Sequence, residues 1–476
     1  MKKVSRIRIT EYCFLILLFG LFSPANAQKK QRLPNIIYIL ADDLGYADLG
    51  CYGQQKIKTP NIDQLAAKGK RFTSFYAGST VCAPSRAALM TGKHTGHVSI
   101  RGNGEFPLPQ DEKTIPELLK ERGYVNGMMG KWGLGLAGTS GSPETRGWDY
   151  FSGHVHHVEG HFQKPDSAWK IKDKVLEKTK IPANLYVNEW FTNEALEFIT
   201  TEKEHPFFLY LSFTLPHAEL VVPDQYIKPY LKENGESIFA PERPHLPGQH
   251  YGPQPAPRAA YAAMVTQMDD YVGKIVQQIH ALGLDEETII IFTSDNGTHK
   301  EGGRSLEDAT QFFQSSGPFK GIKRDLYEGG IRVPFIIRWD TKIEQASYTD
   351  VPAASWDLMA SLAAIAEIQP PENDGISLLP IWKNTASKKM LSTFANRIFY
   401  WEFYEQGYKQ AVRQGNWKAI RFYSNGLPIR TELYNLRTDK GETTDLSSNH
   451  TKEVKALEKI MDKERKPSPN KAFQIR

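Results

Sequence analysis

The sequence predicts an α/β fold with a large mixed, mainly parallel sheet flanked by helices and a smaller C-terminal antiparallel sheet. Short apolar, β-branched runs at residues 35–40, 125–129, 207–213 and 288–293 are typical of buried parallel strands. Helical patterns lie between these runs, the longest over residues 258–282. The 476 residues suffice for one large α/β core and a smaller partner.

The antiparallel sheet is expected after a Pro- and Gly-containing boundary at residues 369–375. Beyond it, residues 397–403, 410–412, 417–422 and 432–436 form short runs separated by Gly and Asn turns. We therefore divide the chain into a signal peptide (1–27), a large α/β domain (28–372) and a C-terminal antiparallel-sheet subdomain (373–476).

The N-terminus has the pattern of a signal peptide. Four Lys and Arg residues lie within the first eight, an apolar run covers residues 12–22, and Ala25 and Ala27 form an A-x-A cleavage site. The apolar run is too short for a permanent membrane anchor. We expect cleavage near Ala27 and export to the periplasm or the medium. Only Cys51 and Cys82 would remain, so no disulfide framework is expected.

Composition and charge narrow the classes of partner. Hydrophobic residues make up 40% of the chain and charged residues 24%, which is typical of a globular protein. The formal net charge of +5 comes from 59 basic and 54 acidic residues, and no long basic run accompanies it. A nucleic-acid partner is therefore not expected, whereas an anionic small substrate fits.

Oxygen-bearing side chains follow two of the predicted strands. Asp42 and Asp43 come after the strand at 35–40, and Asp295 and Asn296 come after the strand at 288–293. Carboxyl ends of parallel strands meet at one edge of a sheet, so these side chains can converge. Four such ligands suit Ca²⁺ or Mg²⁺ better than zinc or copper. Hydrogen-bonded Asx turns without a metal are the alternative.

Cys82 lies in a small-residue loop that leads into a predicted helix. Pro84 suits a helix start, which places Cys82 just outside the helix N-terminus, where negative charge is favoured. Arg86 lies about one turn further along the same side. The segment predicts a seat for an anion, and a buried free cysteine is the alternative.

Residues 82–92 also resemble the first signature of the formylglycine-dependent type I sulfatases, which belong to the alkaline phosphatase superfamily. The matching pattern is Cys-x-Pro-Ser-Arg followed by Thr-Gly. The resemblance implies that a maturation enzyme converts Cys82 to formylglycine, whose hydrate is the nucleophile of the family. It also implies a bound divalent cation, Ca²⁺ rather than Mg²⁺, with five protein ligands. These ligands are Asp42, Asp43, modified Cys82, Asp295 and Asn296.

Two further segments resemble family elements. Residues 123–132 resemble the second signature, although Gly133 stands where the family usually has a histidine. Residues 327–334 resemble a segment in which a lysine five residues before Glu328 contacts sulfate, which indicates Lys323. The neighbouring Lys320 and Arg324 are alternatives for that contact. The resemblance assigns the catalytic set to Cys82, Arg86, Lys131, His217 and Lys323, with His217 as general acid.

The substrate is expected to be a sulfated carbohydrate or an aryl sulfate. Residues 99–103 and 130–133 resemble bacterial exported arylsulfatases and N-acetylgalactosamine-4-sulfatase-like enzymes, which favours galactose or N-acetylgalactosamine 4-sulfate. Polar residues of types that bind sugar hydroxyls follow the signature helix or lie in the His-rich segment 154–161. Those chosen as substrate-binding residues are Arg101, Asn103, His154 and His156. A zinc site or an ordinary surface loop are the alternatives for segment 154–161.

Two other functions stay open at this stage. A formylglycine-dependent phosphonate or phosphodiester hydrolase would use the same core. A catalytically silent protein that binds sulfated glycans would result if Gly133 removed too much chemistry.

Overall fold

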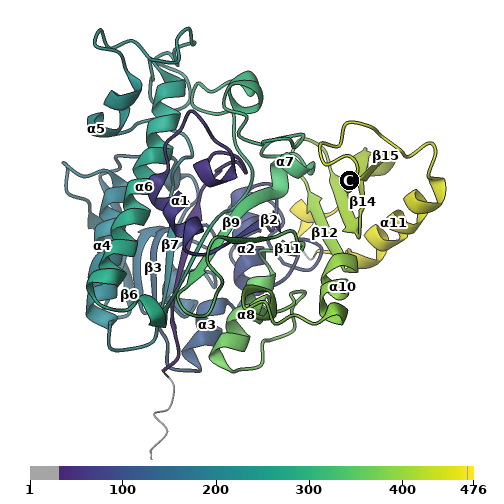
Figure 1. Cartoon of the computed structure of the whole chain (residues 1–476), viewed down its shortest axis with the longest axis horizontal. Coiled ribbons are helices and arrows are strands. Elements are labelled where there is room, and N and C mark those ends of the chain that lie inside the picture. Colours follow the sequence, from purple (N-terminus) through teal and green to yellow (C-terminus); the bar gives the residue numbers. More distant parts are fainter. Residues whose placement is uncertain (1–31, 469, 476) are drawn as a thin grey trace, which may run out of the picture. The chain divides into compact units, whose positions relative to one another are not determined.

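The strands of the large sheet lie side by side between the helices (Figure 1). The structure is a computed structural model that describes residues 32–468 and 470–475. The strands of the large sheet are β1 (Asn35–Ala41), β2 (Lys70–Tyr76), β3 (Val125–Lys131), β4 (Tyr150–His154), β5 (Ser167–Lys172), β6 (Val175–Lys180), β7 (Phe207–Ser212), β8 (Thr288–Ser294), β9 (Arg332–Trp339), β10 (Ser347–Thr349) and β11 (Ala353–Ala354).

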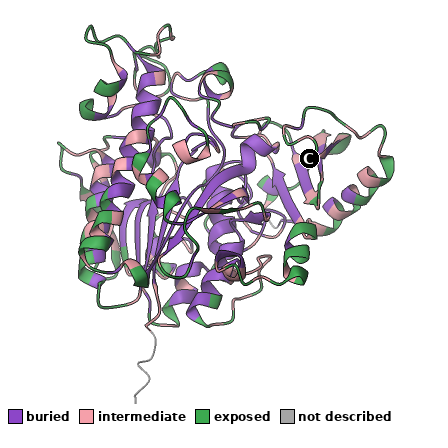
Figure 2. Cartoon of the chain, in the orientation of Figure 1, coloured by how far each residue is buried: buried purple, intermediate pink, exposed green. Residues whose placement is uncertain are grey.

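The strand order confirms a mixed, mainly parallel sheet. Neighbouring strands follow the order β10-β2-β9-β8-β1-β7-β3-β4-β5-β6, and β11 pairs with β2. The block β8-β1-β7-β3-β4 is parallel throughout, whereas β9 runs antiparallel to both of its neighbours. Every residue of β1, β7 and β8 is buried, which explains why these strands read as continuous apolar runs (Figure 2).

Helices cover both faces of this sheet. On one side α6 contacts both α1 and α4, and Figure 1 shows α4 and α6 running together along the strands. On the other side α2, α3 and α8 form a second contacting group. The α-helices are α1 (Pro60–Ala67), α2 (Cys82–Thr91), α3 (Ile115–Lys120), α4 (Val187–Glu202), α5 (Asp224–Ile227), α6 (Pro257–Ala281), α7 (Glu328–Ile331), α8 (Asp357–Ala366), α9 (Leu379–Trp382), α10 (Lys388–Asn396) and α11 (Thr451–Glu464).

The loops also contain short 3₁₀-helices and a short π-helix. They are η1 (Gly50–Tyr52), η2 (Pro143–Thr145), η3 (Glu159–His161), η4 (Lys228–Tyr230), η5 (Asp285–Glu287), the π-helical η6 (Asp308–Phe312) and η7 (Lys471–Phe473).

The predicted C-terminal antiparallel sheet is present and has four strands. They are β12 (Ile398–Phe403), β13 (Lys409–Gln414), β14 (Trp417–Ser424) and β15 (Leu427–Asn435), paired in that order. One face packs against the large-sheet region, where Trp401 joins a buried cluster with Tyr76 and Trp356. The other face is covered by α11 through Leu457 and Met461. The small sheet is thus packed against other elements on both faces.

The predicted signal peptide at 1–27 lies outside the described residues. Among the residues that are described, no helix is both long and apolar enough to cross a membrane.

Candidate active site

Carboxylates from two neighbouring strands meet at one edge of the large sheet. Strands β1 and β8 pair in register up to their last residues, so Asp42 and Asp43 emerge beside Asp295. The ligand atoms of these three buried carboxylates lie within 4.8 Å of one another. Asp43 has a left-handed φ of 63°, a conformation that aspartate tolerates better than most residues. Asn296 Nδ2 donates to Asp43 Oδ1 at 2.6 Å.

The unmet hydrogen-bonding capacity of this cluster fits a divalent cation. Asp42 Oδ1 and Asn296 Oδ1 are buried, and neither makes a hydrogen bond within the described part of the chain. Burial and the charge of Asp42 raise the pKa of Asp295 to about 7, because three carboxylates share one desolvated space. Oxygen ligands of this kind suit Ca²⁺ or Mg²⁺, so the residues present fit the predicted metal.

Cys82 is the first residue of α2, one step inside the helix rather than just outside it as predicted. Val81 gives the helix no side-chain cap, and Asn103 replaces it: Asn103 Oδ1 accepts from Ala83 N at 3.1 Å. The same oxygen lies 3.5 Å from Cys82 Sγ. Burial raises the pKa of the Cys82 thiol, which makes the unmodified side chain a poor nucleophile.

Arg86 and Lys131 contact the carboxylates instead of lining an open cavity. The Arg86 guanidinium donates twice to Asp295 Oδ2, at 3.1 and 2.8 Å, and once to the carbonyl of Lys131 at 2.6 Å. It also donates to Ser212 Oγ. Lys131 Nζ donates to Asp42 Oδ2 at 2.6 Å, and its side chain is fully buried. Both cations therefore fix the positions of the acidic groups.

Lys323 and His217 meet at the third carboxylate. Lys323 Nζ donates to Asp43 Oδ2 at 2.7 Å and lies 3.1 Å from His217 Nε2. His217 Nδ1 donates to the carbonyl of Ala218, which can only accept. Burial and the Lys323 charge hold the pKa of His217 well below its usual value, so its Nε2 carries a lone pair directed at Lys323.

The neighbouring cations that were alternatives to Lys323 have other partners. Lys320 Nζ lies over the Tyr327 ring, 4.0 Å from its centre. Arg324 donates to Glu301 at 2.7 Å. Lys323 is the member of this trio that reaches Asp43.

A cavity of about 510 Å³ opens over Cys82 and Lys323. Several lining residues were not chosen from the sequence. These residues are His157, His161, His250, Tyr251, Glu301 and Glu405, and Arg324, the alternative to Lys323, lines the cavity as well. His161 stacks on His217 with 4.3 Å between ring centres. His157 and His161 belong to the His-rich segment 154–161, so composition gave a signal for them. Glu301 lies in the loop after Asn296, and no sequence pattern in that loop indicates that Glu301 belongs to the site.

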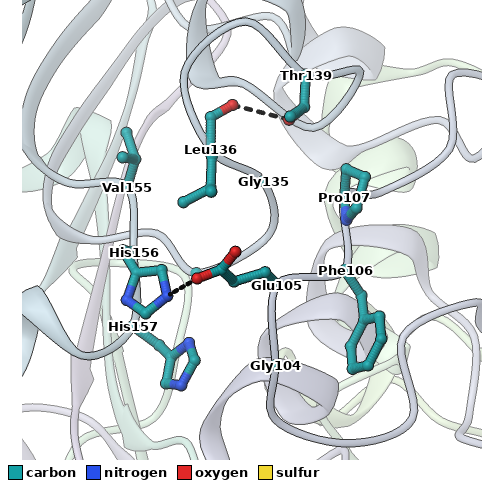
Figure 3. Close-up of a pocket in the computed structure, with 11 residues that line it drawn as sticks. Gly104, Glu105, Phe106, Pro107, Gly135, Leu136, Thr139, Val155, His156 and His157 are labelled. Atoms are coloured by element: carbon teal, nitrogen blue, oxygen red, sulfur yellow. Dashed lines mark hydrogen bonds and ion pairs between the residues drawn. The ribbon is translucent and has the colours of Figure 1, made fainter. Parts of the chain in front are cut away.

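The four predicted substrate-binding residues lie in different places. Asn103 lines the cavity over Cys82, and His156 lines a smaller neighbouring cavity (Figure 3). Arg101 does neither, because it is 2% exposed and its guanidinium donates to Glu402 at 2.7 Å.

His154 is also buried, at 1% exposure, and burial and the Lys131 charge lower its pKa to about 3. Arg101 and His154 therefore line neither of the two cavities in this structure. Among the described residues, no group of His, Cys, Asp and Glu side chains placed to hold a metal includes a residue of segment 154–161. The zinc alternative for that segment therefore has no support.

Comparisons with known proteins agree with this geometry. The family model "Sulfatase" matches residues 34–368, and the model "N-sulphoglucosamine sulphohydrolase, C-terminal" matches residues 319–467. N-acetylgalactosamine-6-sulfatase of Rattus norvegicus is 33% identical over 377 residues, which are 73% of this chain and 65% of the relative. The chain thus spans about two thirds of the length of that relative.

A bacterial relative and a solved structure align over more of their length. N-acetylgalactosamine-6-O-sulfatase of Bacteroides thetaiotaomicron is 28% identical and aligns over 92% of this chain and 94% of the relative. The crystal structure of Ps i-CgsB in complex with k-i-k-neocarrahexaose has a TM-score of 0.73 at 27% identity, covering 91% of this chain and 94% of that one.

The family resemblance inferred from the Cys82 segment is therefore confirmed. The matched range runs from the strand before Asp42 past Lys323 and includes every residue of the carboxylate cluster. Relatives named as sulfatases, which are sulfuric ester hydrolases, align over most of the same range. The chain belongs to the sulfatase family.

Proposed function

We propose that this chain hydrolyses sulfate esters of saccharides and releases inorganic sulfate. One observation carries the proposal: Cys82 stands at the N-terminus of α2, at the base of a cavity that also exposes Lys323 and adjoins three convergent carboxylates. The N–H groups of the first helical turn and the lysine favour an anion at this point.

The chemistry requires a change at Cys82. Formylglycine at this position would supply a hydrated aldehyde, one hydroxyl of which attacks sulfur while loss of the other's proton later expels sulfate. Cys82 is only 1% exposed in the folded chain. We therefore propose that a maturation enzyme acts on this segment before folding buries it.

A divalent cation, with Ca²⁺ preferred, would be held by Asp42, Asp43, Asp295 and Asn296, together with the modified residue 82. Arg86, Lys131 and Lys323 already balance the charges of the three carboxylates. A bound cation would therefore supply a net positive charge that attracts the sulfate and makes the nucleophile more acidic.

The residues of the chain then have separate tasks. Asn103 holds the first turn of α2 and so fixes residue 82. Arg86 and Lys131 keep Asp295 and Asp42 in place. Lys323 faces the cavity and stabilises charge on the non-bridging oxygens of the ester.

His217 would deliver the proton that a departing sugar alkoxide needs. Its Nε2 accepts from the Lys323 ammonium and carries no proton of its own, so His217 would take up a proton from solvent at Nε2 before passing it to the leaving oxygen. Its Nδ1 stays bonded to the carbonyl of Ala218, which keeps the ring in one orientation.

Relatives guide the choice of substrate. Two relatives are named for the 6-sulfate of N-acetylgalactosamine, and a solved neighbour is bound to a neocarrahexaose. We propose a sulfated saccharide, with N-acetylgalactosamine 6-sulfate ahead of the 4-sulfate expected from the sequence. We also propose export of the mature enzyme, in line with the expected signal peptide.

The experiment has two stages. The chain is made together with a sulfatase-maturation enzyme, and the intact mass of the Cys82 peptide is measured. We expect a loss that corresponds to exchange of sulfur for oxygen and removal of two hydrogens. Sulfate release is then followed on 4- and 6-sulfated galactose and N-acetylgalactosamine.

Two outcomes would contradict the proposal. A thiol retained under conditions that convert a control sulfatase would favour the silent glycan-binding alternative. Faster cleavage of aryl phosphonates or phosphodiesters than of any sulfate ester would favour the hydrolase alternative.

A further inference from the structure

A second cavity of about 240 Å³, drawn in Figure 3, lies beside the cavity over Cys82. The two share Gly104 and His157 in their walls. Four apolar residues contribute side chains to the lining of the second cavity. That group is Phe106, Pro107, Leu136 and Val155.

Gly133 forms part of the lining of this cavity. Gly133 has a left-handed φ of 76°, and a Cβ added there would meet only His157 Cβ, at 3.7 Å. A Cβ at this position would lie next to His157, which lines both cavities. The departure from the family histidine therefore coincides with open space beside the candidate active site.

Hydrogen bonds between backbone segments hold this cavity in shape. Gly133 N donates to the carbonyl of Val155 at 3.2 Å, and Leu108 N donates to the carbonyl of Leu134 at 2.8 Å. Thr139 Oγ1 donates to the carbonyl of Leu136 at 2.7 Å, a bond drawn in Figure 3. A site built from such fixed loops needs little ordering when a ligand binds.

The lining combines apolar walls with one polar pair. Leu136 and Val155 offer surface to an apolar face, while His156 Nε2 and Glu105 Oε1 lie 3.1 Å apart at one side (Figure 3). No lysine or arginine belongs to the described lining, so a second sulfate group is not the fitting occupant. A pyranose ring has an apolar C–H face and hydroxyl edges, and the volume is close to the lower end of known ligand pockets, about 300 Å³.

We propose that this cavity binds the uncharged pyranose unit next to the sulfated one, so that the preferred substrate is at least a disaccharide. The inference rests on the proposed function, because it places the sulfated unit in the cavity over Cys82. The shared lining residues Gly104 and His157 place the second cavity beside the one that would hold the sulfated unit.

The test compares kcat/KM for a sulfated disaccharide with kcat/KM for the corresponding sulfated monosaccharide. We expect the wild-type ratio to be about tenfold or more. Leu136→Trp should fill the cavity and bring the ratio close to one. Glu105 is exposed, so Glu105→Ala should fold normally and lower the ratio several-fold. Leu306 is 51% exposed and lines neither cavity, so Leu306→Trp is the matched control and should keep the wild-type ratio.

A binding measurement separates the subsite from catalysis. The unconverted chain is titrated calorimetrically with both saccharides, and we expect tighter binding of the disaccharide, lost in Leu136→Trp. Equal binding together with a kcat/KM ratio near one, or a wild-type ratio retained in both Leu136→Trp and Glu105→Ala, would overturn the subsite. Preference for an aryl sulfate over the disaccharide would overturn its assignment to a sugar. Tighter disaccharide binding without any sulfate release from converted enzyme would support the subsite and count against the proposed function.

Discussion

Under the proposed function, His217 is the residue that protonates the leaving group. We expect His217→Ala to lower kcat/KM on a sulfated sugar by about 10² to 10⁴, because a sugar alkoxide must be protonated as it departs. Activated aryl sulfates should lose far less, since a phenolate leaves without a proton. Sulfate release from both substrates is the measurement, with Lys320→Ala as control because Lys320 lies over Tyr327 instead. Equal losses on both substrates would remove His217 from the acid role.

Asp295 links the cation site to Arg86. Asp295→Asn keeps the shape of the side chain but removes the charge that pairs with the guanidinium at 2.8 Å. We expect loss of bound Ca²⁺, measured by elemental mass spectrometry, and a fall in turnover of more than about a hundredfold. Asp48→Asn is a matched control, because Asp48 is equally buried but bonds Gly45 and Tyr261. Full activity of Asp295→Asn without bound metal would exclude the metal assignment.

The sequence could locate residues whose position follows from a strand end, and it failed where the partner lies far away in the chain. Asp42 and Asp295 converge because β1 and β8 pair in register. Arg101 has the composition of a sugar-binding residue, yet its partner Glu402 comes 301 positions later in the small sheet. Nothing near Arg101 in the sequence indicates that pairing.

At the scale of elements, the apolar runs predicted the central strands well because full burial removes polar residues from both faces. Strand order did not follow from the sequence. Short strands such as β10 and β11 have too few residues to show a pattern. Helix α2 starts at Cys82, earlier than the sequence predicts. Its first turn is capped by Asn103, which lies beyond the helix in the chain, and not by the preceding residue Val81.

A buried charge cluster joins α7 to the small sheet. Lys418 on β14 lies 3.0 Å from Glu328 and 2.8 Å from Glu442, and all three side chains are fully buried. Lys418→Met would leave Glu442 without its cation, while Glu328 would keep Arg332 at 3.0 Å, and we expect the free energy of unfolding to fall by about 3–5 kcal/mol. Denaturant unfolding measures this loss. Lys463→Met, on the exposed face of α11, is the control.

The same variant should be sensitive to pH. Burial raises the pKa of Glu442 from 4.5 to about 7. A carboxyl group with a raised folded-state pKa favours folding below its unfolded pKa and loses that contribution as pH rises through the folded value. Without Lys418 to offset the charge, the stability loss should be larger near about pH 8 than near about pH 6. A loss that does not change across this range would contradict the assignment of the cluster.

At the scale of the whole molecule, the small sheet helps to build the candidate active site. Glu405, which follows β12, accepts from Asn103 N at 3.2 Å and lies 3.6 Å from Arg324. Glu402 on β12 pairs with Arg101, two residues before Asn103. The segment that caps α2 and so fixes Cys82 is therefore held from the C-terminal side. Arg101 contributes to the site by supporting this segment, a role that its sequence context did not suggest.

Cation binding should then be visible in the stability of the entire fold. The cluster of Asp42, Asp43 and Asp295 joins β1 to β8 in the centre of the large sheet, so a ligand there binds only the folded chain. At a Ca²⁺ concentration about 100 times Kd, the expected stabilisation is about 2.7 kcal/mol, which corresponds to a rise in Tm of about 3 °C for a chain of this size. Calorimetric scans of chelator-treated protein, with and without added Ca²⁺, measure the shift. Asp295→Asn should lose it and Asp48→Asn should keep it; the same shift in all three proteins would place the cation elsewhere.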